Sequence, residues 1–591
     1  MARGNPDRTY TGKIIEMLSA VKLELFRSKK AILKLYAANA PFGGNTVGIE
    51  AAAWRYTGRG IADMTWAEAA TLAVLPNAPS LIYPGRNSEQ LKLKRDRLLL
   101  TLAERGHIDT LTCELAMGEP LPGAALPMPS LAPHLTDRVW LDEPGTRRRT
   151  TVDPFLQRQV SELVDRHVSS LEGNGIHNAA AVVVEVATGN AVAWVGNSTL
   201  PDNTGRHGRD VDMITAPRST GSIMKPFLYA GLLSSGQLLP NALVPDIPTR
   251  FQGFRPENAD FSYSGAVPAG DALARSLNIP AVRMLQMYEE ERFLLLLRNM
   301  GFTTFTRPAS HYGLSLILGG GEATLWELAS AYASMARVLT EKRQSQFSPA
   351  SIWLTYEALR RVNRPETETG WQYFGGAPEV AWKTGTSFGY RDAWAIGTTP
   401  DYVVAVWAGN ADGEGRPGLS GITSAAPLLF DVIRLLPPAG SWFTRPEEGM
   451  TLVEVCSASG YRAGPDCTER RTEWIPEAGL RSEACPYHTV VNLDPSGKFR
   501  VNSTCATPDE MVAQSWFVLP PAMEYYYRMR NPSYKTLPPF RKGCSDDLQV
   551  PSMEFIYPPR DARIFIPRSL QGRPMSMLPE IAHRRRDATV Y

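Results

Sequence analysis

The feature that most constrains the fold is a short stretch at 221–226, Gly-Ser-Ile-Met-Lys-Pro, which sets a hydroxyl and an amine three residues apart. Positions i and i+3 share one face of a helix, so the Lys225 amine can lie beside the Ser222 hydroxyl. Pro226 lacks an N–H group and is tolerated in a first helical turn, which places Ser222 at a helix N-terminus. There the unpaired N–H groups and the helix dipole favour an anion that forms when Ser222 attacks a substrate. A serine also needs a neighbouring base, and an amine whose pKa is lowered by a second cation can serve.

Two later motifs complete an ordered trio with this stretch. Ser-Leu-Asn follows at 276–278, and Lys-Thr-Gly-Thr follows at 383–386. An S-x-x-K match alone is weak, because several arise by chance in a chain of this length. Ser276–Asn278 alone reads as a helix C-cap and turn, and the Lys383 stretch alone reads as a solvated strand edge. Together and in this order, S-x-x-K, S-x-N and K-T-G resemble serine β-lactamases and penicillin-binding proteins.

Length and composition restrict the remaining interpretations. A chain of 591 residues is expected to hold several domains, and 43% hydrophobic with 21% charged residues is typical of a globular protein. A net charge of +2 does not suggest nucleic-acid binding. No apolar run approaches the roughly 18 residues of a membrane helix, and Met1–Pro6 opens no secretory signal.

The first part of the chain, residues 1–135, reads as helical, with apolar positions at helical spacing over 12–40, 66–75 and 88–105. Three stretches resemble later motifs of family 51 peptidoglycan glycosyltransferases. They are Lys13 with Glu16, the segment from Lys29 through Tyr36, and the run Glu-Ala-Ala-Thr-Leu-Ala-Val-Leu-Pro at 68–76. The resemblance implies a partial all-α, lysozyme-like domain. Lys13, Glu16, Lys29 and Tyr36 would then be remnants of its site.

Two departures from that family lead to a functional expectation. Gly12 stands at an arginine position of the first motif, and Ala38 at an asparagine position of the second. The glutamate that serves as the family's base should lie upstream of Lys13, where none of the preceding residues fits. We therefore expect the chain to be truncated at both its N-terminus and its C-terminus. We also expect that it does not polymerise glycan. A complete glycosyltransferase domain of this family is compatible with a divalent metal.

Residues 136–150 are interpreted as linker, and 151–440 as a second domain. A helix is expected from about 154 to 171, and a hairpin over 179–195 turns at Thr188-Gly189-Asn190. Strands are expected at 380–386, 392–397 and 402–408, with helices over 222–233, 270–276, 282–300 and 323–339 between them. This order of strands, helices and strands predicts an α+β domain, an antiparallel sheet flanked by helices.

The last part divides into a cysteine-containing module, 441–545, and an incomplete β-rich module, 546–591. Strands are expected at 524–527, 553–557 and 563–567. Disulfides Cys456–Cys467 and Cys485–Cys505 are predicted, each closing a short polar loop, with Cys544 left over. Cys485 and His488 resemble half of a zinc site, but no matching half is evident in the sequence, so no metal is assigned.

Further runs at 314–329 and 390–397 resemble segments that flank the K-T-G strand, and the chain from about 9 to 570 resembles the class A (bifunctional) penicillin-binding proteins, 1C branch. This resemblance implies a D,D-transpeptidase that cross-links peptidoglycan stem peptides without a cofactor. Ser222 would attack a carbonyl, Lys225 would take its proton, and Ser276 would pass protons to the leaving group. Asn278 would bind Lys225 and the substrate backbone, while Lys383 would lower the Lys225 pKa and attract a carboxylate. Substrate and oxyanion contacts would come from Thr384, Gly385 and Thr386.

The same resemblance implies partners and a location. Stem peptides, lipid II, β-lactam inhibitors and other cell-wall synthesis proteins are the expected partners, at the periplasmic face of the inner membrane. A serine β-lactamase-like hydrolase would share the trio, but it would also need an E-x-x-L-N base, which the segment starting at Glu291 does not match. A non-catalytic penicillin-binding sensor or scaffold is the other alternative.

Overall fold

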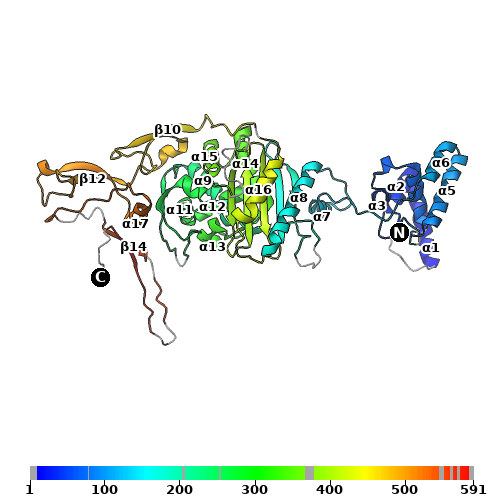
Figure 1. Cartoon of the computed structure of the whole chain (residues 1–591), viewed down its shortest axis with the longest axis horizontal. Helices are drawn as coiled ribbons and strands as arrows, with labels where there is room; N and C mark the ends of the chain where they lie inside the picture. Colours follow the sequence, from blue (N-terminus) through cyan, green and yellow to red (C-terminus); the bar gives the residue numbers. More distant parts are fainter. Residues whose placement is uncertain are drawn as a thin grey trace. The chain divides into compact units, whose positions relative to one another are not determined.

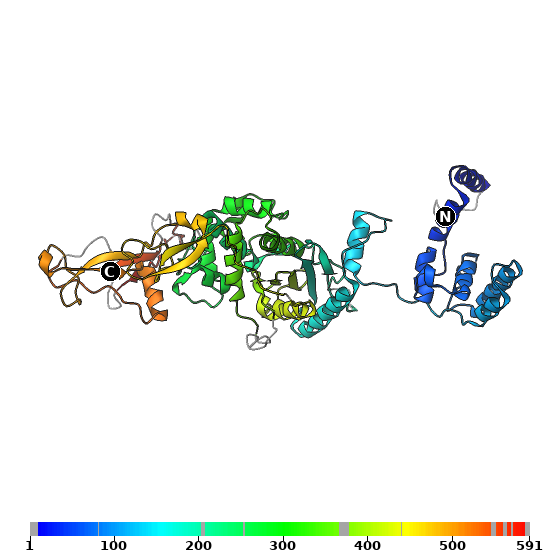
Figure 2. The ribbon, with the colours of Figure 1, turned by 90° about the horizontal axis from the view of Figure 1, so that it is seen from above.

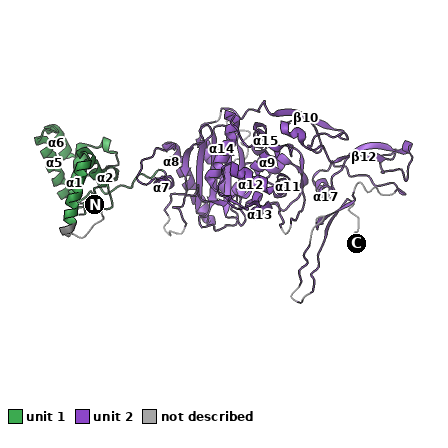
Figure 3. Cartoon of the chain, turned by 180° about the vertical axis from the view of Figure 1, so that it is seen from behind, with its two compact units in different colours: residues 1–131 green, residues 132–591 purple. Residues whose placement is uncertain are grey.

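The computed structural model describes residues 10–584 except 78, 81, 202–206, 252–253, 366–377, 439, 545–550, 559–563, 569–570 and 572. Two sequence predictions, on Met1–Pro6 and on Arg563, lie outside the described residues. The chain separates into two compact units, residues 1–131 and 132–591, which Figure 3 shows in different colours. Among the helices of the described residues, none combines the length and the hydropathy that a bilayer crossing requires.

Unit 1 is all-helical, as predicted. Its helices are α1 (Tyr10–Phe26), α2 (Lys29–Asn39), α3 (Ile49–Thr57), α4 (Trp66–Val74), α5 (Ser88–Glu104) and α6 (Thr110–Gly118), with 3₁₀ turns η1 (Ile61–Asp63) and η2 (Leu75–Asn77). The short α4 is central, because Leu72 packs in a cluster with α3 whereas Ala67 and Ala70 pack in another with α5 and α6. The predicted single pattern over 12–40 is two helices, since the Ser28 side chain accepts a hydrogen bond from Ala31 N–H and begins α2.

The boundary between the units differs from the prediction. The helix α7 (Pro133–Asp142) lies inside the region 136–150 that we interpreted as linker, and unit 2 begins at residue 132. Pro133 occupies the first turn of α7, where its missing N–H costs nothing. His134 is buried, and its Nε2 lies 2.7 Å from the backbone oxygen of Arg209, which ties α7 to unit 2. The linker prediction is therefore wrong for 136–142.

Unit 2 is built on a five-stranded sheet with the order β2-β1-β9-β8-β7, in which every neighbouring pair is antiparallel. Its strands are β1 (Asn178–Glu185), β2 (Ala191–Val195), β7 (Ala381–Thr386), β8 (Asp392–Thr398) and β9 (Tyr402–Gly409). The predicted hairpin and the three predicted later strands are confirmed. Segments some two hundred residues apart thus share one sheet, for example through the pair Val182 and Ala405.

Both faces of the sheet are covered, which explains why its strands are apolar without a break. On β1, Val182 and Val184 face one core cluster, while Ala181 and Val183 face the other. The first face is covered by α14 (Leu325–Glu341), with α9 (Lys225–Ser235) in the same core cluster. The second face is covered by α8 (Pro154–Leu171) and α16 (Ala426–Leu435), as Figures 1 and 2 show from two sides. The α+β prediction is confirmed.

The remaining helices of this region are shorter than predicted in one place. They are α10 (Ala269–Ala274), α11 (Asn278–Tyr288), α12 (Glu290–Asn299), α13 (Ala309–Tyr312) and α15 (Pro349–Arg360), with turns η3 (Glu172–Asn174), η4 (Gly221–Met224), η5 (Gly313–Leu318) and η8 (Gly421–Ala425). The predicted helix 282–300 is broken at Glu289, whose φ is +74°. Two small ribbons, β3 (Arg218–Ser219) with β6 (Glu322–Ala323) and β4 (Leu243–Asp246) with β5 (Gly265–Pro268), complete the region.

The C-terminal part of unit 2 consists of two-stranded ribbons and one helix. Its elements are β10 (Met450–Cys456), β11 (Arg470–Pro476), η9 (Glu477–Arg481), β12 (His488–Leu493), η10 (Pro508–Glu510), β13 (Val512–Phe517), α17 (Pro521–Arg530), β14 (Met553–Tyr557) and β15 (Glu580–His583). The strand predicted at 553–557 is confirmed. The strand predicted at 524–527 is wrong, because Pro521 begins α17 and that helix buries Ala522 and Met523. Residues 564–567 are not a strand either.

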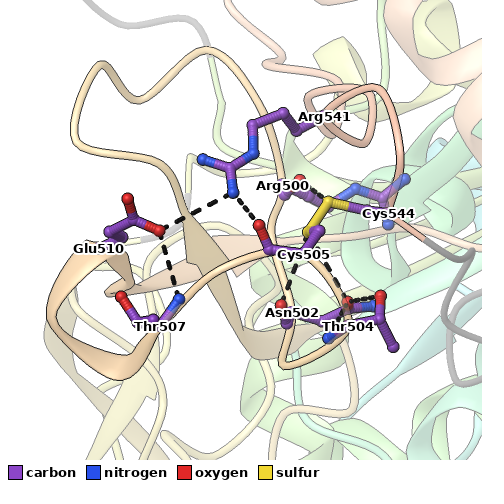
Figure 4. The surroundings of a disulfide bond; sticks show 8 residues. All are labelled: Arg500, Asn502, Thr504, Cys505, Thr507, Glu510, Arg541 and Cys544. Atoms are coloured by element: carbon purple, nitrogen blue, oxygen red, sulfur yellow. Dashed lines mark hydrogen bonds and ion pairs between the residues drawn. A yellow bond between two sulfur atoms is a disulfide. The ribbon is translucent and has the colours of Figure 1, made fainter.

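A disulfide joins Cys505 to Cys544, and Cys456, Cys467 and Cys485 are free thiols. Both predicted pairings are therefore wrong, and Cys544 is not left over. Figure 4 shows why the two cysteines meet: the Arg541 guanidinium donates to the backbone oxygen of Cys505 and pairs with Glu510 at 3.9 Å. These contacts hold the segment before Cys544 against the loop of Cys505.

Reduction of this disulfide should destabilise the C-terminal module. The bond spans 39 residues, and closing a loop of this length removes unfolded-chain entropy worth about 4 kcal/mol. We expect Cys505→Ser to lower the free energy of unfolding of residues 488–544 by about 2–4 kcal/mol. Hydrogen exchange of the β12–β13 amides measures this. Cys113→Ser, which alters a thiol in unit 1, should leave the same amides unchanged.

Candidate active site

Ser222 lies in the 3₁₀ turn η4, immediately before α9. In a 3₁₀ helix residues i and i+3 eclipse each other, which sets the Ser222 and Lys225 side chains one above the other. The Lys225 backbone N–H donates to the Ser222 carbonyl oxygen and joins the turn to α9. Pro226 occupies the first turn of α9, as predicted. The Ser222 side chain is half-buried and therefore open to a substrate.

The Lys225 amine is buried and surrounded by three oxygen acceptors. Its Nζ lies within hydrogen-bond distance of three oxygens, the Asn278 side-chain oxygen at 2.7 Å and the backbone oxygens of Ser276 at 2.8 Å and Leu277 at 3.1 Å. The charged amine can donate to all three, and the neutral amine to two of them. Among the described residues, the hydrogen bonds of this amine do not include Ser222 Oγ. The amine is thus held in position by the second motif, one helical turn from the Ser222 hydroxyl.

The second motif lies in the connection between α10 and α11. Ser276 has a φ of +56°, an unusual conformation for a residue with a side chain, and it makes the chain turn so that Asn278 begins α11. The Lys383 amine of β7 donates to the Ser276 hydroxyl at 2.7 Å and to the Thr384 backbone oxygen at 2.7 Å. One hydrogen-bonded set therefore joins residues from all three motifs.

Hydrogen bonds that hold Asn278 in place were not predicted from the sequence. The Asn278 side-chain N–H donates to the Glu257 backbone oxygen at 2.7 Å, and its backbone N–H donates to the Asn258 side-chain oxygen at 2.9 Å. Asn258 is buried and donates in turn to Asp246 at 2.8 Å. Asn258 belongs to none of the three motifs, so nothing in the sequence indicates that it orients the site.

The two catalytic-motif segments touch through glycines. Gly221 has a φ of +51°, and a Cβ built on it would lie 2.6 Å from the backbone oxygen of Thr386. A Cβ on Gly385 would lie 2.8 Å from the backbone oxygen of Thr220. The prediction that Gly385 lets β7 pass close to Ser222 is confirmed. This approach brings the backbone of Thr386 beside the Ser222 turn, where the predicted oxyanion donors should lie.

Burial sets the charge state of both lysines. Burial chiefly, and then the charge of Lys383, holds the pKa of Lys225 well below its ordinary value. Burial lowers the pKa of Lys383 to about 7. The predicted effect of Lys383 on the Lys225 pKa is present, and the effect of burial is larger.

A cleft of about 510 Å³ opens beside this set. Ser276 and Thr384 line it together with Arg275 and Arg361, and Arg361 also pairs with Asp271 at 2.5 Å. Thr384 and Thr386 are half-buried on β7, and the Thr386 hydroxyl accepts from Gly421 N–H at 3.0 Å. The cleft therefore has hydroxyls and arginines at its wall, a composition suited to a substrate that ends in a carboxylate.

The residues proposed for a glycosyltransferase site do not form a comparable cluster. Lys13 and Glu16 pair with each other at 3.2 Å on the exposed surface of α1, and Lys29 and Tyr36 are exposed on α2. Within the described part of unit 1, no three carboxylate, cysteine or histidine groups converge as a metal site would require. These residues do not fit a divalent metal, and the inactivity expected for this half stays a prediction.

Comparison with known proteins supports both halves. The transglycosylase family model matches residues 1–103, and the model of the penicillin binding protein transpeptidase domain matches residues 179–433. Penicillin-binding protein 1C of Escherichia coli (strain K12) is 33% identical over 575 residues, which is 92% of this chain and 73% of that protein. Penicillin-binding protein 1F of Bacillus subtilis (strain 168) is 26% identical, over 75% of this chain and 66% of that protein.

Among solved structures, penicillin-binding protein 1A from Haemophilus influenzae superposes with a TM-score of 0.54 at 18% identity, over 78% of this chain and 92% of that one. This match shows a shared fold. The two family models and the 1C relative lead to one conclusion. The chain belongs to the class A penicillin-binding proteins of the 1C branch, which combine transglycosylase and transpeptidase domains in peptidoglycan synthesis.

Proposed function

We propose that Ser222 is the acyl-accepting nucleophile of a D,D-transpeptidase and that Lys225 is its general base. The observation that carries this proposal is the hydrogen-bonded set that joins Lys225, Asn278, Ser276 and Lys383 beside the Ser222 turn. A lysine acts as a base when it is neutral, and burial lowers its pKa toward that state. The amine then takes the Ser222 proton as the oxygen attacks.

Each remaining residue has a role in the two steps. Ser222 Oγ bonds to the carbonyl carbon of the penultimate D-alanine, the C–N bond breaks, and the terminal D-alanine leaves with a proton relayed through Ser276. An amine of a second stem peptide then attacks the ester and releases Ser222 with its proton restored. The backbone N–H groups of Ser222 and Thr386 stabilise the oxyanion in both steps. Lys383 and Thr384 receive the terminal carboxylate.

Asn278 serves mainly as a positioning residue in this scheme. Its oxygen accepts from Lys225 and one side-chain N–H is committed to Glu257, so a single N–H remains for the substrate backbone. Asn258 and Asp246 hold it from behind. A substrate therefore meets an amide whose orientation is set before binding.

The pH dependence of acylation should be bell-shaped. The rate rises as Lys225 loses its proton, at a pH well below the ordinary lysine value, and it falls as Lys383 loses the charge that attracts the substrate carboxylate, near pH 7. The acylation rate constant of a fluorescent β-lactam, measured from pH of about 5 to about 10, gives this profile. Lys383→Arg keeps its charge throughout, so the falling limb should disappear. A falling limb that persists near pH 7 in this variant would contradict the role of Lys383.

A hydrolase and a sensor are the competing functions, and one pair of measurements separates them. Glu291, which begins the nearest match to the E-x-x-L-N pattern, is exposed on α12. We expect the β-lactam adduct to persist far longer than the time in which a lactamase hydrolyses its own adduct. We also expect the purified chain to cross-link the stem peptides of added glycan. Rapid loss of the adduct would favour the hydrolase. A stable adduct without cross-linking would favour the sensor.

The partners and location follow from the same proposal. Stem peptides ending in two D-alanines are the donor substrates, β-lactams are inhibitors, and lipid II is the substrate class of the transglycosylase domain. Such substrates are presented at the periplasmic face of the inner membrane, where other cell-wall synthesis proteins act. No cofactor is proposed for transpeptidation, because every acid, base and oxyanion role is assigned to a side chain or backbone group.

A further inference from the structure

Four side chains with metal-binding chemistry converge in the C-terminal module, far from the active site in sequence. Cys456 ends β10, Cys467 lies in the turn that leads to β11, and Cys485 and His488 lie at the start of β12. Their ligand atoms all lie within 4.8 Å of one another. We infer that Cys456, Cys467, Cys485 and His488 form a structural zinc site of the Cys₃His type.

The distances match a tetrahedral centre. His488 Nδ1 lies 3.5 Å from the sulfur of Cys456, 3.6 Å from that of Cys467 and 3.4 Å from that of Cys485. With Zn–S of about 2.3 Å and Zn–N of about 2.0–2.1 Å, two corners of a tetrahedron occupied by sulfur and nitrogen lie about 3.6 Å apart. The nitrogen is therefore at the expected corner-to-corner distance from all three sulfurs at once.

Hydrogen-bond donors lie next to the sulfurs, as they do next to metal-bound thiolates. The Ser459 hydroxyl donates to the sulfur of Cys485 at 3.1 Å, and the backbone N–H of Gly464 donates to the sulfur of Cys467 at 3.3 Å. Backbone groups of Ala458 and Ser459 are hydrogen-bonded to Cys456 in the turn that follows it. Hydrogen bonds to the charged form stabilise that form. Each of the three sulfurs thus has a polar group of the surrounding loops at hydrogen-bond distance, as a metal-bound thiolate would.

The disulfide alternative explains less of this arrangement. Three thiols meet, so any disulfide among them leaves one thiol over and gives the imidazole no role. The same module does contain a disulfide, Cys505–Cys544, and there the two sulfurs are bonded and no histidine approaches within the described residues. Three thiolates and one imidazole are a soft, nitrogen-and-sulfur donor set that selects Zn²⁺ over Ca²⁺ or Mg²⁺.

The proposed site has no open coordination position, and it lies where a metal would join two ribbons. Cys456 and Cys467 are buried, and four protein ligands fill a tetrahedral shell without a free position for substrate. The ladder between β10 and β11 already joins the segments of Cys456 and Cys467. The segment of Cys485 is joined to them through Arg462, whose backbone oxygen accepts from Cys485 N–H at 2.8 Å and whose side chain donates to the Ser482 backbone oxygen at 2.7 Å. A metal would join the β10–β11 ribbon to the β12–β13 ribbon, a role that small modules with little core require.

The site also lies next to the connection between this module and the transpeptidase domain. Ser459, which donates to Cys485, accepts a backbone hydrogen bond from Leu243 at 2.9 Å, and Tyr461 donates to the Leu243 oxygen at 3.3 Å. Leu243 begins β4, which ends at Asp246, the residue that holds Asn258. Zinc is therefore expected to hold the module against β4.

The test is the zinc content of the full chain, purified without chelator and with zinc in the medium. We expect about one zinc per chain, and a tetrahedral thiolate spectrum when Co²⁺ replaces it. His488→Ala and Cys467→Ser should reduce the zinc content at least about tenfold. His488→Cys should restore it, because four thiolates also form a tetrahedral site. Cys113→Ser, which changes a buried thiol in unit 1, is the matched control and should keep the wild-type content.

A second measurement uses the wild-type chain and therefore does not depend on whether a variant folds. A mercurial titration of the wild-type thiols should release one zinc in step with three thiols, and labelling by β-lactam at Ser222 reports that the transpeptidase domain is folded throughout. Wild-type chain that contains no zinc and does not take it up after chelation would overturn the proposal. Peptide mapping that finds two of Cys456, Cys467 and Cys485 joined in a disulfide would overturn it as well.

Discussion

A β-lactam should leave one covalent adduct on the wild-type chain and none on Ser222→Ala. The reason is that only a nucleophile at the head of α9, beside a buried amine, can open the lactam carbonyl and keep the acyl group as an ester. Intact-mass analysis after incubation with penicillin measures this directly. The expected difference is complete, since alanine offers no atom to form the bond.

The matched control for this prediction lies on the same helix. Ser235 is half-buried near the C-terminal end of α9, and its hydroxyl donates to the Leu232 backbone oxygen at 3.0 Å, away from the site. Ser235→Ala should therefore acquire the adduct at the wild-type rate. An adduct of unchanged mass on Ser222→Ala would show that another residue is the nucleophile and would refute the assignment.

The second large effect is expected for Lys225→Met, which keeps the size of the side chain and removes the amine. A general base contributes roughly 10²–10⁴-fold to rate, so the acylation rate constant should fall by about that factor. The rising limb of the pH profile should also disappear, because its titrating group is gone. Stopped-flow acylation with a fluorescent β-lactam across the pH range measures both quantities.

A purely structural effect of Lys225→Met has to be distinguished, because the change leaves the Asn278 side-chain oxygen without its donor. Tyr229→Phe is a suitable control on the same helix. It removes a buried hydrogen bond to the Pro240 backbone oxygen, at 3.1 Å, and should cost about 1–3 kcal/mol of stability while acylation stays near the wild-type rate. If Lys225→Met acylates within about tenfold of wild type at neutral pH, Lys225 is not the base.

The sequence was sufficient for the order and chemistry of the site but not for its support. The three motifs predict that Ser222, Lys225, Ser276, Asn278 and Lys383 belong to the site. They can do so because each motif has a fixed spacing and each of these positions requires one kind of functional group. Asn258 and Asp246 act through an amide and a carboxylate that occur in no fixed spacing from the motifs. Only the fold brings them behind Asn278.

The fold itself was predicted best where the pattern is long and periodic. The apolar strands β1, β8 and β9 are buried on both faces, so nearly all of their residues are apolar, and this composition predicts buried strands. The aromatic run 525–527 misled the prediction, because aromatic residues favour strands until Pro521 and the buried Met523 are seen to form a helix. The disulfides failed for a related reason: loop length says nothing about which sulfurs meet.

The contact between glycines of the first and third motifs has an evolutionary consequence. Gly221 and Gly385 each face backbone of the other segment, and a Cβ on Gly319 would lie 2.6 Å from the Gly221 backbone nitrogen. Substitution at any of the three pushes main chain against main chain, which no side-chain rotation relieves. Under antibiotic selection, a substitution at these positions is therefore expected to disrupt the site itself and not only its binding of the drug. Resistance changes are expected more readily at residues whose side chains line the cleft, such as Arg275 and Thr384.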